Sequence, residues 1–240
     1  MRVLVTNVTQ YAGPGTIPVL LRDGCDVLCH DGSFTDPVAR AAYSDRHPGA
    51  LCLDAQTPEE IHAAVTGDGR PVDGIVSNDI YPITRNAIEE IPLNDLRSTF
   101  EAVLVFPFRL TQLFLPAMKT RRAGTFVFVT SARPRRAEPG FAVPTSIRAG
   151  TSAFALALAK ETAQFGIQVN VVAPNYLYSE MYYPKAQFVD DPAGRAVIAS
   201  TVPAGRLGEP EEIGELIGFL VSGRSPFTTG QVIDFTGGWP

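Results

Sequence analysis

The sequence predicts an α/β fold built on one doubly wound, parallel sheet of about seven strands with helices on both faces. Two observations lead to this prediction. Short apolar runs rich in β-branched residues recur along the chain, and helical patterns separate most of them. Strands that are covered on both faces are apolar throughout, and a parallel connection between them requires a helix-length crossover. The alternation therefore favours a sheet between two helical layers.

Seven segments have the strand pattern. They are RVLVTN (2–7), CDVLCHD (25–31), ALCLD (50–54), DGIVSND (73–79), TFVFVTS (125–131), IQVNVVAP (167–174) and QVIDF (231–235). Helical patterns cover the stretches 14–23, 36–45, 57–66, 94–120, 144–165 and 209–222.

The 240 residues, 45% of them hydrophobic, are enough to bury one large core. Neither a repeat nor a low-complexity linker divides the chain, so we expect a single domain over 1–240. Within it, the stretch 175–203 is rich in Tyr and Pro and precedes the helix start GRLGEPEE. Long connections of this kind are often functional, and we interpret this one as a substrate lid or an irregular cap.

The net charge of −5 disfavours a surface for nucleic acid or for an anionic membrane, because phosphate binding requires clustered positive charge. The one basic cluster, Arg133, Arg135 and Arg136, is followed by Glu138, and we interpret it as a solvated loop. No apolar run approaches the roughly 20 residues that span a bilayer, and the first residues lack a signal-peptide layout. We therefore expect a cytoplasmic protein with no membrane partner.

The three cysteines are an odd number, and Cys25 and Cys29 lie in or beside one apolar run. This placement suits buried, reduced thiols better than a disulfide framework. The sequence Cys29-His30-Asp31 has no second Cys/His pair at a useful spacing, so we expect no metal site.

In doubly wound sheets ligands bind beyond the carboxyl ends of the strands, and the turn after the first strand reads TNVTQYAG (6–13). The chain resembles the short-chain dehydrogenase/reductase superfamily, Rossmann-like dinucleotide-binding proteins with the fingerprint TGxxxGxG in this turn. Thr6 and Gly13 match it, whereas Asn7 and Tyr11 occupy the first two glycine positions. A phenol ring where the backbone should touch phosphate would block the nucleotide, so we expect no cofactor.

Within that superfamily the chain resembles the halohydrin dehalogenases, whose turn follows Thr-x-x-x-x-(Phe/Tyr)-x-Gly. Further stretches support the resemblance: CHDGSF (29–34), VSNDI (76–80), APNYLYSE (173–180) and the C-terminal GQVIDFTGGWP. The resemblance implies conversion of vicinal halo-alcohols to epoxides with release of halide, and the reverse opening of epoxides by small anions. No hydride moves in this reaction.

The resemblance also implies an anion pocket. Its members would be Tyr11, Pro174, Asn175, Tyr176 and Leu177, with Trp239 lining this pocket or that of a neighbouring subunit. Backbone amides and polarizable walls suit a large, weakly hydrated anion. Asp79, after the fourth strand, is a candidate to hold Arg148 or to pass on a proton, or it serves as a turn residue.

The catalytic signature of that family is Ser-x12-Tyr-x3-Arg, in which the tyrosine is the base and the arginine lowers its pKa. Ser131 and Arg148 have the expected separation, but Pro144 occupies the tyrosine position. Proline offers neither a proton nor a donor, and the stretch 132–166 contains no tyrosine.

Three explanations remain open. A different base reaches the pocket, the candidates being Tyr176, Tyr178, Tyr182, Tyr183, Glu138 and Asp79. Alternatively, Ser131 and Arg148 only polarise an epoxide, or catalysis is lost and the chain is a binding or partner subunit. A further class, an NAD(P)-dependent oxidoreductase, is favoured by the fold alone.

Two helical stretches suggest an assembly. The stretch 144–166 is rich in Ala, Gly and Ser, and 96–118 is apolar nearly all round. Small residues permit close approach of helices, and an apolar helix must be buried by something. The resemblance implies that these helices build a homotetramer.

Overall fold

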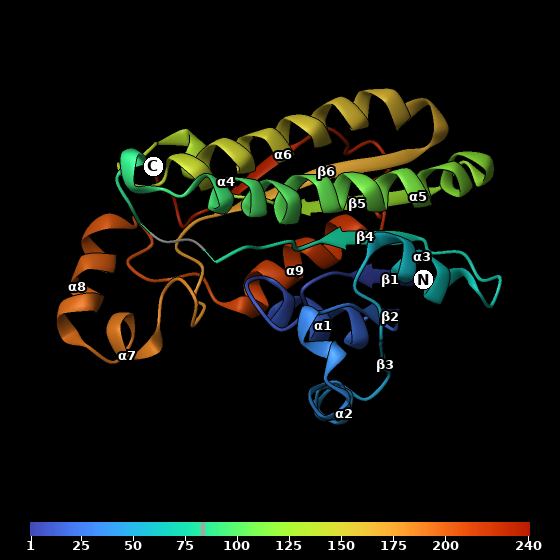
Figure 1. The fold of residues 1–240 in the computed structure, drawn as a ribbon, viewed down its shortest axis with the longest axis horizontal. Helices are drawn as coiled ribbons and strands as arrows, with labels where there is room; N and C mark the ends of the chain where they lie inside the picture. Colours follow the sequence, from blue (N-terminus) through green and yellow to red (C-terminus); the bar gives the residue numbers. More distant parts are fainter. Residues whose placement is uncertain (83–84) are drawn as a thin grey trace.

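The computed structural model describes residues 1–82 and 85–240. At its centre is a sheet of seven parallel strands in the order β3-β2-β1-β4-β5-β6-β7 (Figure 1). The strands are β1 (Arg2–Val5), β2 (Asp26–Cys29), β3 (Ala50–Cys52), β4 (Gly74–Ser77), β5 (Gly124–Val129), β6 (Ile167–Pro174) and β7 (Val232–Phe235). The predicted doubly wound α/β sheet is confirmed, and each strand lies within its predicted segment except β5, which starts one residue earlier, at Gly124.

The strand order reverses between β1 and β4. The chain builds β1, β2 and β3 outward to one edge, returns to place β4 on the other side of β1, and continues outward to β7. Connections on the two sides of this point diverge to opposite faces of the sheet, which leaves a crevice at the carboxyl ends of the strands. The turn after β1 and the segments after β4, β5 and β6 meet there.

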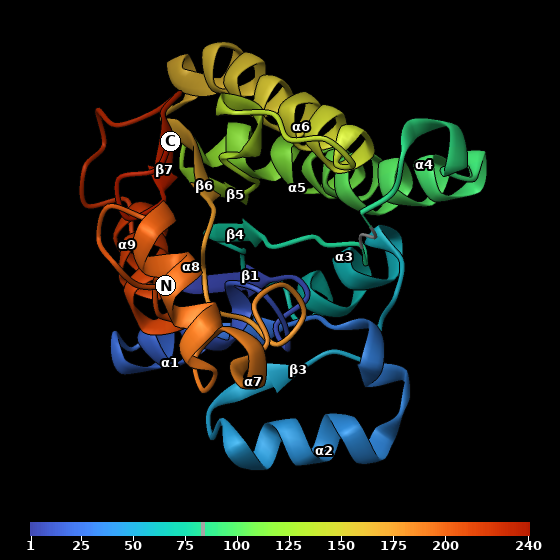
Figure 2. The same cartoon turned by 90° about the vertical axis from the view of Figure 1, so that its left-hand side faces the viewer.

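Helices cover both faces of the sheet (Figure 2). Side chains of α1 (Gly13–Arg22), α2 (Pro37–Arg46) and α9 (Pro210–Val221) share one buried cluster with the sheet. Side chains of α3 (Pro58–Thr66), α5 (Phe106–Arg121) and α6 (Ala142–Thr162) share the other. Because both faces are covered, all eight residues of β6 are buried.

The predicted helix 94–120 is one continuous helical stretch with a wider turn inside it. α4 (Leu93–Phe100) passes through a π-helical turn over Glu101–Val105 into α5. By length and composition this stretch, Leu93–Arg121, is long and apolar enough to cross a membrane, with a mean hydropathy of 1.3. Packed helices pass the same test, and here the stretch lies against α3 and α6.

The segment after β6 is only partly irregular. It contains two helices, α7 (Lys185–Phe188) and α8 (Pro192–Thr201), so the prediction of an irregular cap is wrong for these residues. The Asp191 carboxylate caps α8 by accepting from the amides of Ala193 and Gly194. Residues from α8 and the following turn, Ile198, Val202 and Leu207, form a small hydrophobic cluster separate from the two large ones. In Figure 1, β4 points toward the side where α7 and α8 lie.

Glycines allow α1 and α9 to touch along their backbones. A Cβ atom on Gly15 would lie 1.7 Å from the Pro210 carbonyl oxygen, and one on Gly214 would lie 2.2 Å from the Gly15 carbonyl oxygen. Neither neighbour is a flexible side chain, so neither can move aside cheaply. This contact fixes the start of α1, and with it the turn that follows β1.

We therefore expect Gly15→Ala to destabilise the protein by about 1–3 kcal/mol or more, because overpacking outweighs the gain in helix propensity. The matched control is Gly32→Ala, where a Cβ would meet only the Gln56 Oε1 atom at 3.9 Å. Urea unfolding of both variants at one protein concentration measures the difference. Equal midpoints for Gly15→Ala and the unmodified chain would contradict the close packing.

Candidate active site

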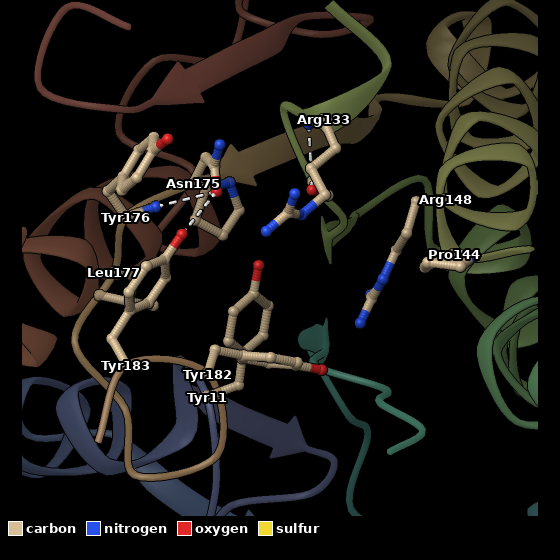
Figure 3. Close-up of a pocket in the computed structure, with 11 residues that line it drawn as sticks. Tyr11, Arg133, Pro144, Arg148, Asn175, Tyr176, Leu177, Tyr182 and Tyr183 are labelled. Atoms are coloured by element: carbon tan, nitrogen blue, oxygen red, sulfur yellow. Dashed lines mark hydrogen bonds between the residues drawn. The ribbon is translucent and has the colours of Figure 1, made fainter. Parts of the chain in front are cut away.

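A cavity of about 50 Å³ lies at the carboxyl ends of β1, β5 and β6 (Figure 3). It is lined by Tyr11, Ser131, Arg133, Pro144, Arg148, Pro174, Asn175, Tyr176, Leu177, Tyr182 and Tyr183. Eight of these residues were expected from the sequence: Ser131 and Arg148 as catalytic, Pro144 at the position of the family's base, and five of the others as anion-binding. The fold brings all eight together. Tyr182 and Tyr183 were named only as possible bases.

The residues of the catalytic signature lie on one side of the cavity. Ser131 follows β5, and its Oγ accepts a hydrogen bond of 3.1 Å from the Arg133 amide. The Arg148 guanidinium, on α6, is buried and donates to the Val129 carbonyl oxygen at 2.9 Å. Pro144 is the third residue of α6, two residues further into the helix than predicted. Amides of the first turn have no partner within the helix, so proline is tolerated there.

Asn175 lines the cavity, and the donors of its side-chain amide are unpaired among the described residues. Its Oδ1 accepts from the Tyr176 amide at 3.1 Å and from the Tyr183 hydroxyl at 3.2 Å. An amide N–H can only donate, so this contact assigns Oδ1 and leaves Nδ2 on the other side. The Nδ2 atom is buried and has no hydrogen-bond partner among the described residues. A buried donor without an acceptor is costly, and a bound anion would satisfy it.

Aromatic rings form the remaining walls. Tyr11 adopts φ +57°, its hydroxyl donates to the Thr130 carbonyl oxygen at 3.2 Å, and its ring packs edge-on to Tyr182 with centroids 5.5 Å apart. Burial raises the pKa of Tyr11, although the Arg148 charge acts in the opposite direction. Burial likewise raises the pKa of Tyr183 to about 12.

Trp239 does not lie among the residues that line this cavity. It is buried in the core of its own chain, one layer behind the wall, with its ring 5.6 Å from that of Tyr176. Trp239 therefore affects the cavity only indirectly, by packing against Tyr176 and fixing the position of that ring.

Arg133 was missed by the sequence analysis. The interpretation as a solvated loop fits Arg135 and Arg136, which are exposed, but it is wrong for Arg133. The Arg133 side chain lines the cavity, forms an ion pair of 2.9 Å with Glu138 and lies 4.0 Å from the Phe141 ring centroid. The sequence did contain a signal for this role: Arg133 lies two residues beyond Ser131, after the carboxyl end of β5, where residues can reach a site in this fold.

Asp79 lies behind the cavity wall rather than in it. Its Oδ1 accepts from Asn7 Nδ2 at 2.9 Å, and its Oδ2 accepts from the Ser77 hydroxyl. Burial raises the pKa of Asp79 to about 6, although the bond from Ser77 and the charge of Arg148 act in the opposite direction. Asp79 therefore interacts with Arg148 only through its charge, since no hydrogen bond between the two side chains occurs among the described residues.

The nicotinamide nucleotide that this fold suggests does not fit the turn after β1. Asn7 and Tyr11 both have positive φ there, and the Tyr11 phenol crosses to Thr130 over the place for the phosphates. The carboxylate after β2, Asp31, is fully engaged: one oxygen accepts from the amide and hydroxyl of Thr9, the other from those of Ser33. It has no free acceptor for a ribose.

A second cavity, of about 500 Å³, lies on the other side of Tyr11. Its lining contains Glu180 and neither arginine nor lysine among the described residues. At its edge α1 starts with Gly13, whose amide is bonded to Gln10, and Pro14, which has no N–H. This helix end therefore offers few donors to a phosphate.

The fold and the cavity together define a doubly wound domain of the dinucleotide-binding type whose nucleotide turn is filled by an aromatic side chain. A family model, enoyl-(acyl carrier protein) reductase, matches residues 16–240. The 3-oxoacyl-[acyl-carrier-protein] reductase of Vibrio cholerae is 30% identical over 239 residues, covering 98% of this chain and 95% of that protein. The chain belongs to the short-chain dehydrogenase/reductase superfamily.

Solved structures point to one branch of the superfamily. A structure titled "Dehalogenation enzyme" has a TM-score of 0.94 and 38% identity, covering 100% of this chain and 98% of that one. A halohydrin dehalogenase bound to ethyl (2S)-oxiran-2-ylacetate has a TM-score of 0.96 and 35% identity, covering 100% and 97%. These structures confirm the resemblance to halohydrin dehalogenases. Both the reductase that is similar in sequence and the dehalogenases that are similar in structure are enzymes.

We expect Asp79→Asn to change how stability depends on pH. A carboxyl with a raised pKa in the folded state stabilises the fold below its unfolded pKa of about 3.9, and this contribution is lost as pH rises through about 6. Asparagine stays neutral throughout. Relative to the unmodified chain, the variant should gain roughly 3 kcal/mol in unfolding free energy between pH 4 and pH 7, measured by urea titration. A difference that stays constant over this range would contradict the raised pKa.

Proposed function

We propose that the protein is a carbon–halogen lyase of the halohydrin dehalogenase type. It converts vicinal halo-alcohols to epoxides with release of halide and a proton, runs in reverse with small anions, and needs no cofactor. The observation that carries this proposal is Asn175, a residue of the aromatic cavity wall whose buried Nδ2 has no partner among the described residues. This arrangement suits a large, weakly hydrated anion.

The charges around the cavity support an anionic ligand. Arg148 is buried at one side, and Arg133 is largely buried at another, with a side-chain exposure of 23%. Glu138 compensates Arg133, whereas Asp79 lies behind the wall near Arg148. Halide adds negative charge between two guanidinium groups in a site shielded from water, where electrostatic attraction is strong.

Ser131 and Arg148 have clear roles in this reaction. Because the Ser131 Oγ accepts from the Arg133 amide, its own proton is free to donate to the substrate oxygen. Arg148 holds one N–H on the Val129 carbonyl and has further donors beside the cavity. Together they stabilise the oxygen on which negative charge develops, as an oxyanion site does.

The cavity also suggests the size of the substrate. Three tyrosines of the segment after β6, at positions 176, 182 and 183, occupy space that an extended ligand would need. About 50 Å³ remains, which suits a halo-alcohol with a short substituent.

Pro144 favours one alternative, a catalytically impaired homologue that binds a ligand or serves as a partner subunit. An NAD(P)-dependent oxidoreductase is a second alternative, because the curated relatives include acyl-carrier-protein reductases. The filled turn at Tyr11 argues against it.

We expect the purified protein to release bromide and protons in equal amounts from a simple vicinal bromo-alcohol between about pH 6 and 10, a range that leads up to the pKa of a phenol. Pro144→Tyr should also release halide, because it places a tyrosine beside Arg148 at the position of the family's base. Failure of both proteins to release halide would refute the lyase proposal. Saturable binding of NADH or NADPH in a fluorescence titration would instead revive the oxidoreductase.

We also propose that the protein is a cytoplasmic homotetramer. Its three cysteines are free thiols, as in a reducing compartment. Large apolar side chains are exposed along α4 and α5, including Leu93 (58%), Phe100 (46%) and Phe108 (42%). Burying them between subunits removes this apolar surface from water.

We expect Phe100→Glu to lower the molar mass in light scattering, because a carboxylate would be buried at the interface without a partner. Val38→Glu is the matched control: Val38 is 74% exposed on α2, across the sheet from α4 and α5. An unchanged mass for both variants would place any interface elsewhere.

A further inference from the structure

Tyr182 brings a free hydroxyl into the cavity. The residue lies on the segment between β6 and α7, and its ring packs edge-on to Tyr11 at an interplanar angle of 75°. Its hydroxyl oxygen is buried and makes no hydrogen bond with any described residue. Figure 3 shows Tyr11 and Tyr182 beside each other, across the cavity from Arg148 and Pro144. A buried hydroxyl without a partner is costly, so this one is placed to meet a ligand.

The other candidate bases are engaged or unfavourably placed. The hydroxyl groups of Tyr178 and Tyr183 are bonded to Glu180 and Asn175, respectively. Burial raises the pKa of Tyr176 as it does that of Tyr182, but the strongest nearby charge is the Glu138 carboxylate for Tyr176, which raises the pKa further, and the Arg148 cation for Tyr182, which lowers it. Glu138 itself is paired with Arg133. Asp79 is behind the wall, bonded to Asn7 and Ser77.

Two cations act on Tyr182 from different elements. Burial raises the pKa of the Tyr182 hydroxyl. Arg148 on α6 opposes this most, through its charge and then through the close approach of its side chain to the hydroxyl, and the charge of Arg133 after β5 follows. The neighbouring Tyr11, after β1, is the other titratable group that faces it. Two guanidinium groups thus favour the phenolate in a site that otherwise disfavours charge.

We propose that Tyr182 is the catalytic base that replaces the tyrosine missing from position 144, with Arg133 as a positioning residue and Arg148 serving both the base and the substrate oxygen. This inference rests on the proposed function. The base has moved from α6 to the segment after β6, and it approaches the same arginine from the opposite side of the cavity.

The Tyr182 phenolate takes the proton of the substrate hydroxyl while Ser131 donates to the same oxygen. The oxygen then forms a bond to the neighbouring carbon, and the carbon–halogen bond breaks with its electron pair on the departing halide. The proton on Tyr182 passes to solvent, so the products are epoxide, halide and one proton.

We expect Tyr182→Phe to lower kcat by about 10²–10⁴-fold with little change in KM, since general base catalysis contributes about this much. The matched control is Tyr178→Phe, which removes a hydroxyl from the same segment outside the cavity and should leave kcat unchanged. Bromide titration followed by the fluorescence of Trp239, the one tryptophan of the chain, reports whether the anion site of each variant is intact.

The pH profile separates a catalytic from a structural role. Because only the phenolate accepts a proton, kcat/KM of the unmodified protein should rise with pH toward the raised pKa of Tyr182. Arg133→Met removes one cation and should move the rising limb to higher pH, while Arg133→Lys should restore it. A rising limb unmoved by Arg133→Met would overturn the role of Arg133.

A second-site variant distinguishes failure of this inference from failure of the proposed function. Pro144→Tyr combined with Tyr182→Phe should regain activity that Tyr182→Phe loses. Full activity in Tyr182→Phe alone would overturn Tyr182 as base and leave the lyase standing. If the unmodified protein is inactive and the Pro144→Tyr variant is active, Tyr182 is also overturned as base. This result would mean that the anion site is intact but that the unmodified protein has no working base. Inactivity of both would refute both proposals.

Discussion

The hydrogen bond from the Tyr11 phenol to the Thr130 carbonyl is the contact on which the cavity depends. It joins the ends of two strands whose residues are 119 positions apart in the chain. A positive φ at a residue other than glycine costs about 1 kcal/mol, and the bond, together with packing against Tyr182, offsets this cost. The same ring closes the place where a nucleotide would lie and forms one wall of the cavity of about 50 Å³.

Charge is distributed around this ring in two pairs. Arg133 has Glu138 as a direct partner, while Arg148 has a carboxyl only at a distance, in Asp79. The burial that raises the pKa of Asp79 to about 6 also raises that of Tyr182. Burial disfavours the charged forms of both groups, and the charge of Arg148 opposes this effect in both cases. Hydride transfer would require space for a dinucleotide, and the Tyr11 ring fills part of that space.

The sequence predicted the sheet well because parallel strands buried on both faces are continuously apolar. Ser131 and Arg148 were predicted from the spacing of a family signature, and Asn175 from the resemblance of the stretch after β6 to the same family; the structure places all three at one cavity. The spacing could not show that the 3-10 turn Arg133–Arg135 directs the first of its arginines into the cavity. Nor could it select Tyr182 among four tyrosines, because the selection depends on which hydroxyl groups find partners in three dimensions. The depth of Trp239 is likewise set by packing against Tyr176 and not by its place near the C-terminus.

The small cluster of Ile198, Val202 and Leu207 has a consequence for the working temperature of the protein. A cluster of this size holds its segment with far less free energy than the two large cores hold the sheet, so it can open locally while the sheet stays folded. Tyr176 and Tyr183 pack against this cluster and also line the cavity. Heat should therefore dismantle the cavity before it melts the domain, and a bound anion should delay that loss, because a ligand stabilises the state to which it binds.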